Sequence, residues 1–478
     1  MSEPPGRGGR YRRVVDLDVL VIGSGPSGQK AAIQAAKLGR PVAVVERRQR
    51  VGGVSIHTGT IPSKTLREAV LDELARRPLD VPDPVHPEYQ ERAAIDFLRD
   101  RTARVVGAEA AVVREQFRRN GVGLLFGEGE FVDQHSVRVR DEETTQVFTA
   151  DRIVIAVGTR PARPADVDFD DRTIIDSDGL LQLEHRVPRS MTVVGAGVIG
   201  VEYASIFGAL GTKVTVVDQR PRVLGFLDAE IGEALQYILR RQNVTFRLNE
   251  QVDRVARRDG GGALTHLASG KVIASETVLY ATGRQGVTEQ LGLERAGLEA
   301  DRRGRIPVDE RYATPVPHIF AVGDVAGPPG LAATAMEQGR LATLHALEQP
   351  VHTLANLIPT GIYAIPEVSM VGRTEEELTE AAIPYVAGLA RWSEMARGLM
   401  SGDEDGILKL LVSPDDRRLL GVHVLGTGAT DLVHIGQAVM GGEGTADFLV
   451  SAVFNYPTFA ESYKIAALDA LNRLTLGV

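Results

Sequence analysis

Short apolar runs that end in glycine, each followed by a helical pattern, recur along the chain. Residues 19–22 form such a run before Gly23, and a helical pattern follows over residues 29–38. Residues 191–194 form a second run before Gly195, with another helical stretch behind it. A buried strand, a tight turn and a helix in this order are typical of a βαβ unit. The pattern predicts an α/β fold built on parallel strands.

The two runs repeat in register, 172 residues apart. Each carries the pattern G-x-G-x-x-G, with Gly23, Gly25 and Gly28 in the first and Gly195, Gly197 and Gly200 in the second. The first glycine permits the bend, the second lets a pyrophosphate approach the helix N-terminus, and the third lets the helix pack closely on the strand. The second strand of each unit ends in an acid that suits a ribose hydroxyl, Glu46 or Asp218. We therefore predict two Rossmann-like dinucleotide-binding domains.

Similar strands close both units, at Gly158 and Gly283. Between residues 61 and 120 the first unit carries an insertion that is predicted to be mostly helical, with a proline-rich loop near residues 79–87. From about residue 359 the chain alternates strands and helices without a glycine motif. The predicted segments are a disordered arm over 1–16, a first dinucleotide-binding domain over 17–158 and 284–355, a second over 159–283, and a C-terminal α+β domain over 356–478.

Composition and charge narrow the kinds of function. Of the 478 residues, 54 are Lys or Arg and 63 are Asp or Glu, and the net charge of −9 argues against a nucleic-acid partner. The chain has no cysteine, which excludes disulfides, thiolate metal sites, iron–sulfur clusters and cysteine nucleophiles. Its ten histidines show no metal-binding spacing, so we expect no metal. Its apolar runs are too short to cross a membrane, and the arm lacks a signal-peptide core, which predicts a cytoplasmic protein.

Two further motifs connect the chain to a known family. Residues 52–64 read G-G-V-S-I-H-T-G-T-I-P-S-K, and residues 456–461 read Y-P-T-F-A-E. They resemble the motifs G-G-x-C-x(4)-C-I-P-S-K and H-P-T-x-x-E of the pyridine nucleotide-disulfide oxidoreductases. Ser55 and Thr60 replace the two redox cysteines, and Tyr456 replaces the acid–base histidine. A disulfide reductase needs a dithiol and a base, whereas an enzyme that only moves hydride needs neither.

This resemblance, which extends from about residue 18 to the C-terminus, implies that the first domain binds FAD and the second binds NAD or NADP. The residues implied at FAD are Gly23, Gly25, Gly28, Glu46, Arg47, Gly52, Gly53, Ser55, Thr60 and Asp324. Those implied at the nicotinamide dinucleotide are Gly195, Gly197, Gly200, Asp218, Arg220, Arg222, Gly283 and Arg284. The C-terminal domain is implied to be a dimerisation domain, so we expect a two-fold homodimer.

Charged residues in both domains suggest how coenzymes are chosen and used. Asp218 suits the free 2′-hydroxyl of NAD and would repel the 2′-phosphate of NADP. Arg220 and Arg222 could offset that repulsion, or they could form a solvated loop. The resemblance implies that Lys64 lies beside the reacting atom of the flavin and pairs with Glu202, which gives both a catalytic role.

Residues 59–70, 360–369, 434–440 and 455–463 are similar to the transhydrogenase branch of this family. That similarity implies an FAD-dependent enzyme that moves hydride from NADPH to NAD in a ping-pong sequence. An NAD(P)H:quinone or dye reductase on the same fold, and a non-catalytic protein that senses redox cofactors, stay open as alternatives. Tyr456 either covers the flavin of a partner subunit or packs in the core.

Overall fold

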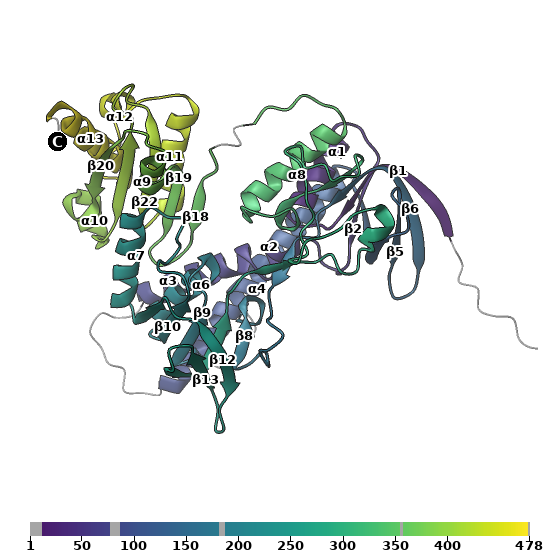
Figure 1. Cartoon of the computed structure of the whole chain (residues 1–478), viewed down its shortest axis with the longest axis horizontal. Helices are drawn as coiled ribbons and strands as arrows, with labels where there is room; N and C mark the ends of the chain where they lie inside the picture. Colours follow the sequence, from purple (N-terminus) through teal and green to yellow (C-terminus); the bar gives the residue numbers. More distant parts are fainter. Residues whose placement is uncertain (1–11, 77–86, 181–186, 354–356, 477–478) are drawn as a thin grey trace, which may run out of the picture. The chain divides into compact units, whose positions relative to one another are not determined.

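The computed structural model describes residues 12–76, 87–180, 187–353 and 357–476 (Figure 1). The chain divides into two compact units. The first unit takes in the described residues up to Thr65, Asp100–Ala162 and Gly283–His352. The second unit takes in the described parts of Leu66–Arg99, Arg163–Thr282 and Thr353–Val478. The three-domain division drawn from the sequence stays a prediction.

A five-stranded parallel sheet forms the centre of the first unit. Its order is β3-β2-β1-β6-β17, with β3 over Gly123–Phe126, β2 over Val42–Glu46, β1 over Arg12–Ile22, β6 over Thr145–Ile155 and β17 over Ile319–Ala321. All five residues of β2 are buried, as expected for a strand covered on both faces. Strands β4 (Glu128–Phe131) and β5 (Ser136–Arg140) continue from β6 as an antiparallel meander.

The first strand begins earlier than the sequence predicts. The disordered arm was expected to extend to Asp16, but β1 starts at Arg12, and Arg12, Val15 and Asp16 pair with the beginning of β6. The Thr149 hydroxyl also donates a hydrogen bond to Asp16. Backbone pairing with a long neighbouring strand thus extends β1 beyond the apolar run at residues 19–22, and the expectation for residues 12–16 was wrong. Residues 1–11 lie outside the described part of the chain.

Helices α1 and α8 lie together against the sheet of the first unit. Helix α1 (Pro26–Lys37) joins β1 to β2, and α8 (Ala332–Ala346) packs on it. The two backbones approach so closely that a Cβ atom on Gly339 would lie 2.0 Å from the Ser27 carbonyl oxygen. The predicted insertion is helical where it is described, with α3 over Thr60–Arg76 and α4 over Pro87–Arg119. Most of the predicted proline-rich loop lies outside the described residues.

The second unit contains a parallel sheet in which four strands have the same order as β3-β2-β1-β6 of the first unit. The order is β11-β10-β9-β15-β8, with β11 over Val244–Leu248, β10 over Lys213–Asp218, β9 over Ser190–Val194, β15 over Thr277–Tyr280 and β8 over Ile174–Asp176. Its edge strand β8 precedes the other four strands in the chain, whereas β17 follows the other four strands of its sheet. Helix α6 (Val198–Ala209) joins β9 to β10, as α1 joins β1 to β2. The internal repeat in the sequence is therefore a repeat of topology over these four strands.

The C-terminal part of the second unit is an antiparallel sheet with helices. Its strands are β18 (Thr360–Ile362), β19 (Val368–Gly372), β22 (Leu419–Leu425), β21 (Ile407–Val412) and β20 (Val386–Arg391). Helix α11 (Ala429–Gly441) packs on β22, and α13 (Ser462–Leu476) packs on β20 and β21. These elements confirm the predicted α+β character. Among the described helices, none is long and apolar enough to cross a membrane.

One hydrophobic core joins the parallel and antiparallel parts of the second unit. Helix α6 is buried along nearly its whole length, because Met191 and Val193 of the parallel sheet and Ile362 and Val368 of the antiparallel sheet belong to the same cluster. A helix that is apolar all round needs such cover on several sides. Glu202 is one of its buried residues, and its carboxylate accepts a hydrogen bond from the Tyr363 backbone N–H at 2.9 Å.

Candidate active site

The two glycine turns are held by equivalent backbone contacts. Gly23 N donates to Val45 O at 2.8 Å, and 172 positions later Gly195 N donates to Val217 O at 2.8 Å. Gly23 has a φ of +109°, and a Cβ atom there would lie 2.3 Å from the Ala156 carbonyl oxygen. Gly195 has a φ of +112° and the same kind of obstruction. Only glycine fits the first position of either turn.

The third glycine of each turn lets the helix close on the strand. A Cβ atom on Gly28 would lie 1.9 Å from the Gly23 carbonyl oxygen, and one on Gly200 would lie 2.0 Å from that of Gly195. Real Cβ atoms do not approach backbone oxygens so closely, so any larger residue would push the helix away. The helix N-termini therefore start directly beneath the carboxyl ends of β1 and β9.

The middle glycines are different, because a Cβ atom at either position would not clash with any other atom of the chain. Gly25 has an ordinary φ of −65°, and a Cβ atom on it would meet nothing within 4 Å. Gly197 has a φ of −81°, and its Cβ would meet only the Arg220 guanidinium at 4.0 Å. Each is the N-cap of its helix, where free N–H groups and the helix dipole attract anions. An open glycine at this place fits a pyrophosphate lying against the backbone.

The acid at the end of each second strand makes the same backbone contacts in both units. Glu46 accepts hydrogen bonds from Ser24 N at 3.2 Å and Arg48 N at 2.9 Å. Asp218 accepts them from Ala196 N at 2.6 Å and Arg220 N at 2.8 Å, at positions that correspond through the repeat. Both carboxylates are thereby fixed beside the glycine turn.

Their side-chain partners differ in charge. Glu46 accepts a hydrogen bond from the neutral Ser24 hydroxyl at 2.5 Å. Asp218 is bound by the Arg220 guanidinium, with Nε 2.9 Å from Oδ1 and Nη2 2.6 Å from Oδ2. Burial opposes ionisation of Asp218, but the hydrogen bonds from Arg220 and Ala196 outweigh it and lower the pKa of the carboxyl below its usual value. Among the described residues, Asp218 thus forms an ion pair with a guanidinium, whereas the side-chain partner of Glu46 is a hydroxyl.

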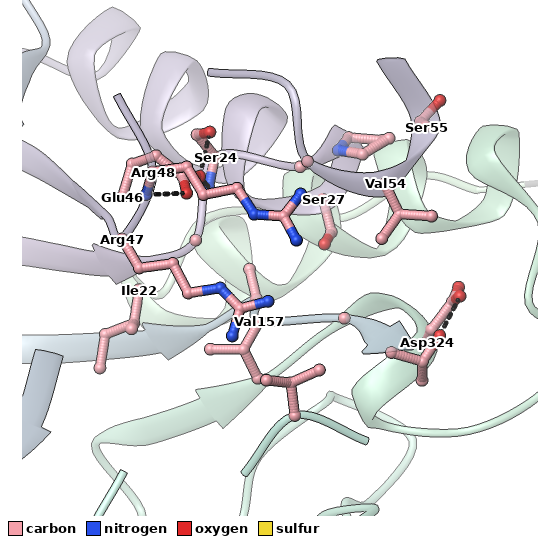
Figure 2. Close-up of a pocket in the computed structure, with 18 of the residues that line it drawn as sticks. Ile22, Ser24, Ser27, Glu46, Arg47, Arg48, Val54, Ser55, Val157 and Asp324 are labelled. Carbon is pink, nitrogen blue, oxygen red and sulfur yellow. Dashed lines mark hydrogen bonds between the residues drawn. The ribbon is translucent and has the colours of Figure 1, made fainter. Parts of the chain in front are cut away.

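A cavity opens along the glycine turn of the first unit (Figure 2). Eight predicted cofactor residues line it: Gly23, Gly25, Glu46, Arg47, Gly53, Ser55, Thr60 and Asp324. Gly28 and Gly52 lie behind the lining, where the Gly52 N–H donates to the Ser24 hydroxyl at 3.0 Å. Gly53 backs onto the turn, since its Cβ would lie 2.8 Å from the Gly25 Cα. Sequence reasoning missed other lining residues, including Ser24, Arg48, Arg50, Thr159 and Gln290.

Thr159 joins two predicted residues at one edge of this cavity. Its hydroxyl donates to Asp324 Oδ2 at 2.9 Å and accepts from Arg284 Nε at 2.7 Å, while Arg284 Nη2 donates to the Thr159 carbonyl at 2.9 Å. Asp324 is thereby held in one orientation. The position of Thr159 directly after Gly158 was the available sequence signal. Arg284, which was assigned to the nicotinamide dinucleotide, makes these contacts inside the first unit.

The other predicted residues are spread over several elements. Lys64 is the fifth residue of α3, and Glu202 lies in α6. Arg222 follows β10, and its Nη1 is 3.3 Å from Glu376 Oε1 of α9 (Glu375–Glu380). Gly283 lies in the first unit, just before Arg284. The proposed roles of these residues stay predictions.

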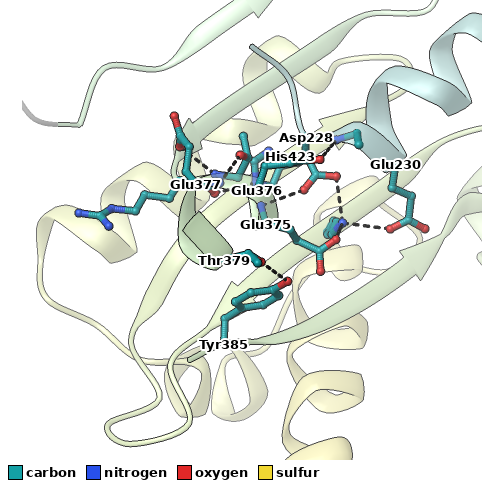
Figure 3. Close-up of polar contacts among 12 residues, drawn as sticks. Asp228, Glu230, Glu375, Glu376, Glu377, Thr379, Tyr385 and His423 are labelled. Carbon is teal, nitrogen blue, oxygen red and sulfur yellow. Dashed lines mark hydrogen bonds and ion pairs between the residues drawn. The ribbon is translucent and has the colours of Figure 1, made fainter. Parts of the chain in front are cut away.

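A buried ionic cluster in the second unit is the one group of described residues with the spacing of a metal site (Figure 3). Carboxylate oxygens of Asp228, Glu230 and Glu375 converge there, but the Lys409 ammonium already lies between them. Its Nζ is 2.9, 3.1 and 2.5 Å from the three carboxylates respectively. Burial alone would lower the pKa of Lys409, but these hydrogen bonds outweigh it and raise the pKa above its usual value. The cluster is an ion pair network with its own cation.

Two dinucleotide units, one with a lined cavity and both with open glycine turns, define a flavoprotein-type oxidoreductase that acts on nicotinamide nucleotides. Residues 17–339 match the pyridine nucleotide-disulphide oxidoreductase family, and residues 358–467 match its dimerisation domain. The chain belongs to the pyridine nucleotide-disulphide oxidoreductase family.

Similar proteins match nearly the whole chain. The soluble pyridine nucleotide transhydrogenase of Mycobacterium tuberculosis is 56% identical over 464 residues, which cover 96% of this chain and 98% of that protein. The protein of the same name from Hahella chejuensis is 45% identical over 463 residues, with 96% and 98% covered. Among solved structures, the HOCl-induced flavoprotein disulfide reductase RclA from Escherichia coli is 27% identical, with a TM-score of 0.83 and coverage of 94% and 99%.

The buried ionic cluster generates a stability prediction. Lys409→Met leaves the Asp228 carboxylate buried without its cation, so we expect a loss of about 3–5 kcal/mol in the free energy of unfolding. Lys271→Met is the control, because the Lys271 side chain that pairs with Glu250 is 60% exposed, and it should cost less than about 1 kcal/mol. Urea denaturation at pH 7 measures both, and equal effects of the two substitutions would contradict the prediction.

The same cluster predicts a pH dependence with a defined sign. The pKa of Asp228 is lowered in the folded state, since hydrogen bonds and charge from Lys409 outweigh its burial. Its stabilisation is therefore present above the unfolded pKa of about 3.9 and is lost as the pH falls through the folded value. In Lys409→Met the lone Asp228 gains by protonation, so the difference from the wild type should shrink toward pH 4. A constant difference from pH 7 to pH 4 would contradict this account.

Proposed function

We propose that the protein is an FAD-dependent transhydrogenase that equilibrates NADPH and NAD with NADP and NADH. The observation that carries the proposal is the different charge around the two equivalent acids. Glu46, whose side-chain partner is the neutral Ser24 hydroxyl, suits a dinucleotide whose ribose hydroxyls are free, as in FAD. Asp218, neutralised by Arg220, suits a ribose with or without a 2′-phosphate. The relatives at 45–56% identity are named for this activity.

The residues of the first unit fit FAD. The open backbone at Gly25 would accept the pyrophosphate at the N-terminus of α1, and Glu46 would accept hydrogen bonds from the adenosine ribose. Arg47 lines the same end of the cavity, and Asp324, oriented by Thr159, is placed to bind the ribitol chain. When bound, FAD supplies a ring that takes hydride from one nicotinamide and gives it to another. The contacts of Arg284 with Thr159 favour a role for Arg284 at this cofactor.

The chain's own residues would then position and exchange the nicotinamide coenzymes. Gly195, Gly197 and Gly200 form the pyrophosphate turn of the second unit, and Arg220 and Arg222 supply charge for a 2′-phosphate. Lys64 and Glu202 are proposed to provide a fixed positive and negative charge beside the reacting ring. Ser55 and Thr60 line the cavity without thiols, so no sulfur carries electrons to a disulfide substrate.

Hydride exchange is tested by measuring its two half-reactions separately, namely reduction of the flavin by NADPH and its reoxidation by NAD. Holoenzyme mixed anaerobically with one equivalent of NADPH should lose its visible flavin absorbance, because hydride reaches the ring. After removal of NADP, added NAD should restore the absorbance and yield one NADH per flavin, as measured by stopped-flow spectroscopy. Restoration by a quinone but not by NAD would overturn the proposal in favour of the reductase.

We further propose a homodimer formed through the C-terminal sheet domain. In the loop before α13, Val453 is 94% exposed and Tyr456 is 74% exposed, so packing of Tyr456 in the core of its own subunit is wrong. Phe448 of α12 (Ala446–Ser451) is 56% exposed in the same stretch. Apolar side chains gathered so closely in sequence favour cover by a partner, and the family's dimerisation domain includes all three positions. A working location in the cytoplasm stays a prediction.

The proposed homodimer predicts the molecular mass of the protein in solution. Light scattering at micromolar concentration should give twice the chain mass of 51.5 kDa, and Val453→Glu should shift the protein toward the monomer by placing a charge in the interface. A wild-type mass of one chain would exclude the homodimer.

A further inference from the structure

The arginine assigned to the 2′-phosphate is held by a carboxylate from outside the nucleotide-binding sheet. Arg222 Nη1 lies 3.3 Å from Glu376 Oε1 of α9. The same oxygen accepts a hydrogen bond from Ala229 N, at the start of α7 (Ala229–Arg241), at 3.0 Å. Glu376 Oε2 is buried and has no hydrogen-bond partner among the described residues. Figure 3 labels Glu376 beside the ionic cluster.

Both candidate phosphate ligands are therefore already matched by acids. Asp218 neutralises Arg220, and Glu376 neutralises Arg222, so the two pairs carry no net positive charge. A 2′-phosphate carries close to two negative charges at pH 7. These arginines attract the phosphate only if at least one of them breaks its ion pair with Asp218 or Glu376.

The Arg220–Asp218 and Arg222–Glu376 ion pairs differ in strength. The weaker pair is the one that we expect a phosphate to break. Arg220 binds Asp218 through two nitrogens at 2.6 and 2.9 Å, and the Arg220 side chain is 53% exposed while that of Asp218 is 5% exposed. Arg222 binds Glu376 through one longer contact, with the side chains 44% and 39% exposed. Exposed single contacts are the weaker kind of ion pair. Arg222 is therefore the arginine that exchanges.

Release of Arg222 leaves Glu376 supported. Its Oε1 keeps the hydrogen bond from Ala229 N, and the N-terminal end of the 13-residue helix α7 favours a negative charge. The carboxylate thus has two alternative sources of compensation, one fixed and one exchangeable. This arrangement differs from the cluster around Lys409, where the cation is fully buried among three carboxylates.

We infer that Glu376 is a specificity-determining residue that holds Arg222 away from the 2′-phosphate and so weakens binding of NADP(H) relative to NAD(H). This inference rests on the proposed function, because it assigns the 2′-phosphate to Arg220 and Arg222. Competition from Glu376 lowers the affinity for NADP(H) and leaves the affinity for NAD(H) unchanged. A transhydrogenase must release both coenzymes in each cycle. Weaker binding of NADP(H) favours its release.

The test uses Glu376→Gln in the holoenzyme. Glutamine keeps an oxygen for Ala229 N, so the helix cap is preserved while the charge that holds Arg222 is removed. Titration calorimetry with adenosine 2′,5′-bisphosphate and with 5′-AMP measures the effect of the phosphate directly. We expect the bisphosphate to bind roughly two- to fivefold more tightly than to wild type, as the loss of a weak ion pair allows, and 5′-AMP to bind unchanged.

Two further variants show whether the effect passes through Arg222. Glu380→Gln removes the same charge from an exposed position of the same helix and should shift neither ligand. In Glu376→Gln with Arg222→Ala, the gain for the bisphosphate should disappear. An unchanged bisphosphate affinity in Glu376→Gln, an equal gain for both ligands, or an equal gain in Glu380→Gln would each overturn the inference.

Failure of the inference and failure of the proposed function are distinguishable. If wild-type enzyme passes hydride from NADPH to NAD but Glu376→Gln leaves the ratio of the two affinities unchanged, only the role of Glu376 falls. If wild-type enzyme fails to bind adenosine 2′,5′-bisphosphate at all, the assignment of NADP to this unit falls as well.

Discussion

Each dinucleotide unit depends on a backbone approach that leaves no room for a Cβ atom. At Gly28 and Gly200 the helix lies so close to the turn that a Cβ would be about 2 Å from a carbonyl oxygen. This contact places the first N–H groups of α1 and α6 at the carboxyl ends of their strands. At Gly25 and Gly197, by contrast, the backbone is open. The backbone is therefore tightly packed at the third glycine of each turn and accessible to a phosphate at the second.

In the proposed function, the same scaffold gains two specificities through one side chain in each unit. The acid is fixed by equivalent backbone N–H groups in both, but Glu46 has the Ser24 hydroxyl where Asp218 has the Arg220 guanidinium. We propose that the neutral partner leaves a carboxylate for free ribose hydroxyls, whereas the cationic partner offsets the negative charge and admits a phosphate. With no cysteine in the chain, no thiol can relay electrons to a disulfide substrate.

The features read correctly from the sequence were those fixed by local backbone geometry. A glycine turn between strand and helix needs glycine at set spacings, so the repeat at Gly23 and Gly195 predicted two units with the same topology. The start of β1 at Arg12 depends on pairing with β6, which no local pattern reports. Thr159 and Glu376 act through contacts with residues more than 150 positions away, so their roles needed the fold.

The central claim is that the two open glycines face different dinucleotides, and a matched pair of variants tests it most directly. Gly25→Val and Gly197→Val each place a side chain where the chain itself leaves space, so both should fold. Flavin content after purification and the reaction with NADPH are the measurements. The account predicts that Gly25→Val is colourless, while Gly197→Val is yellow but is no longer bleached by NADPH. A yellow Gly25→Val protein that reacts normally would contradict it.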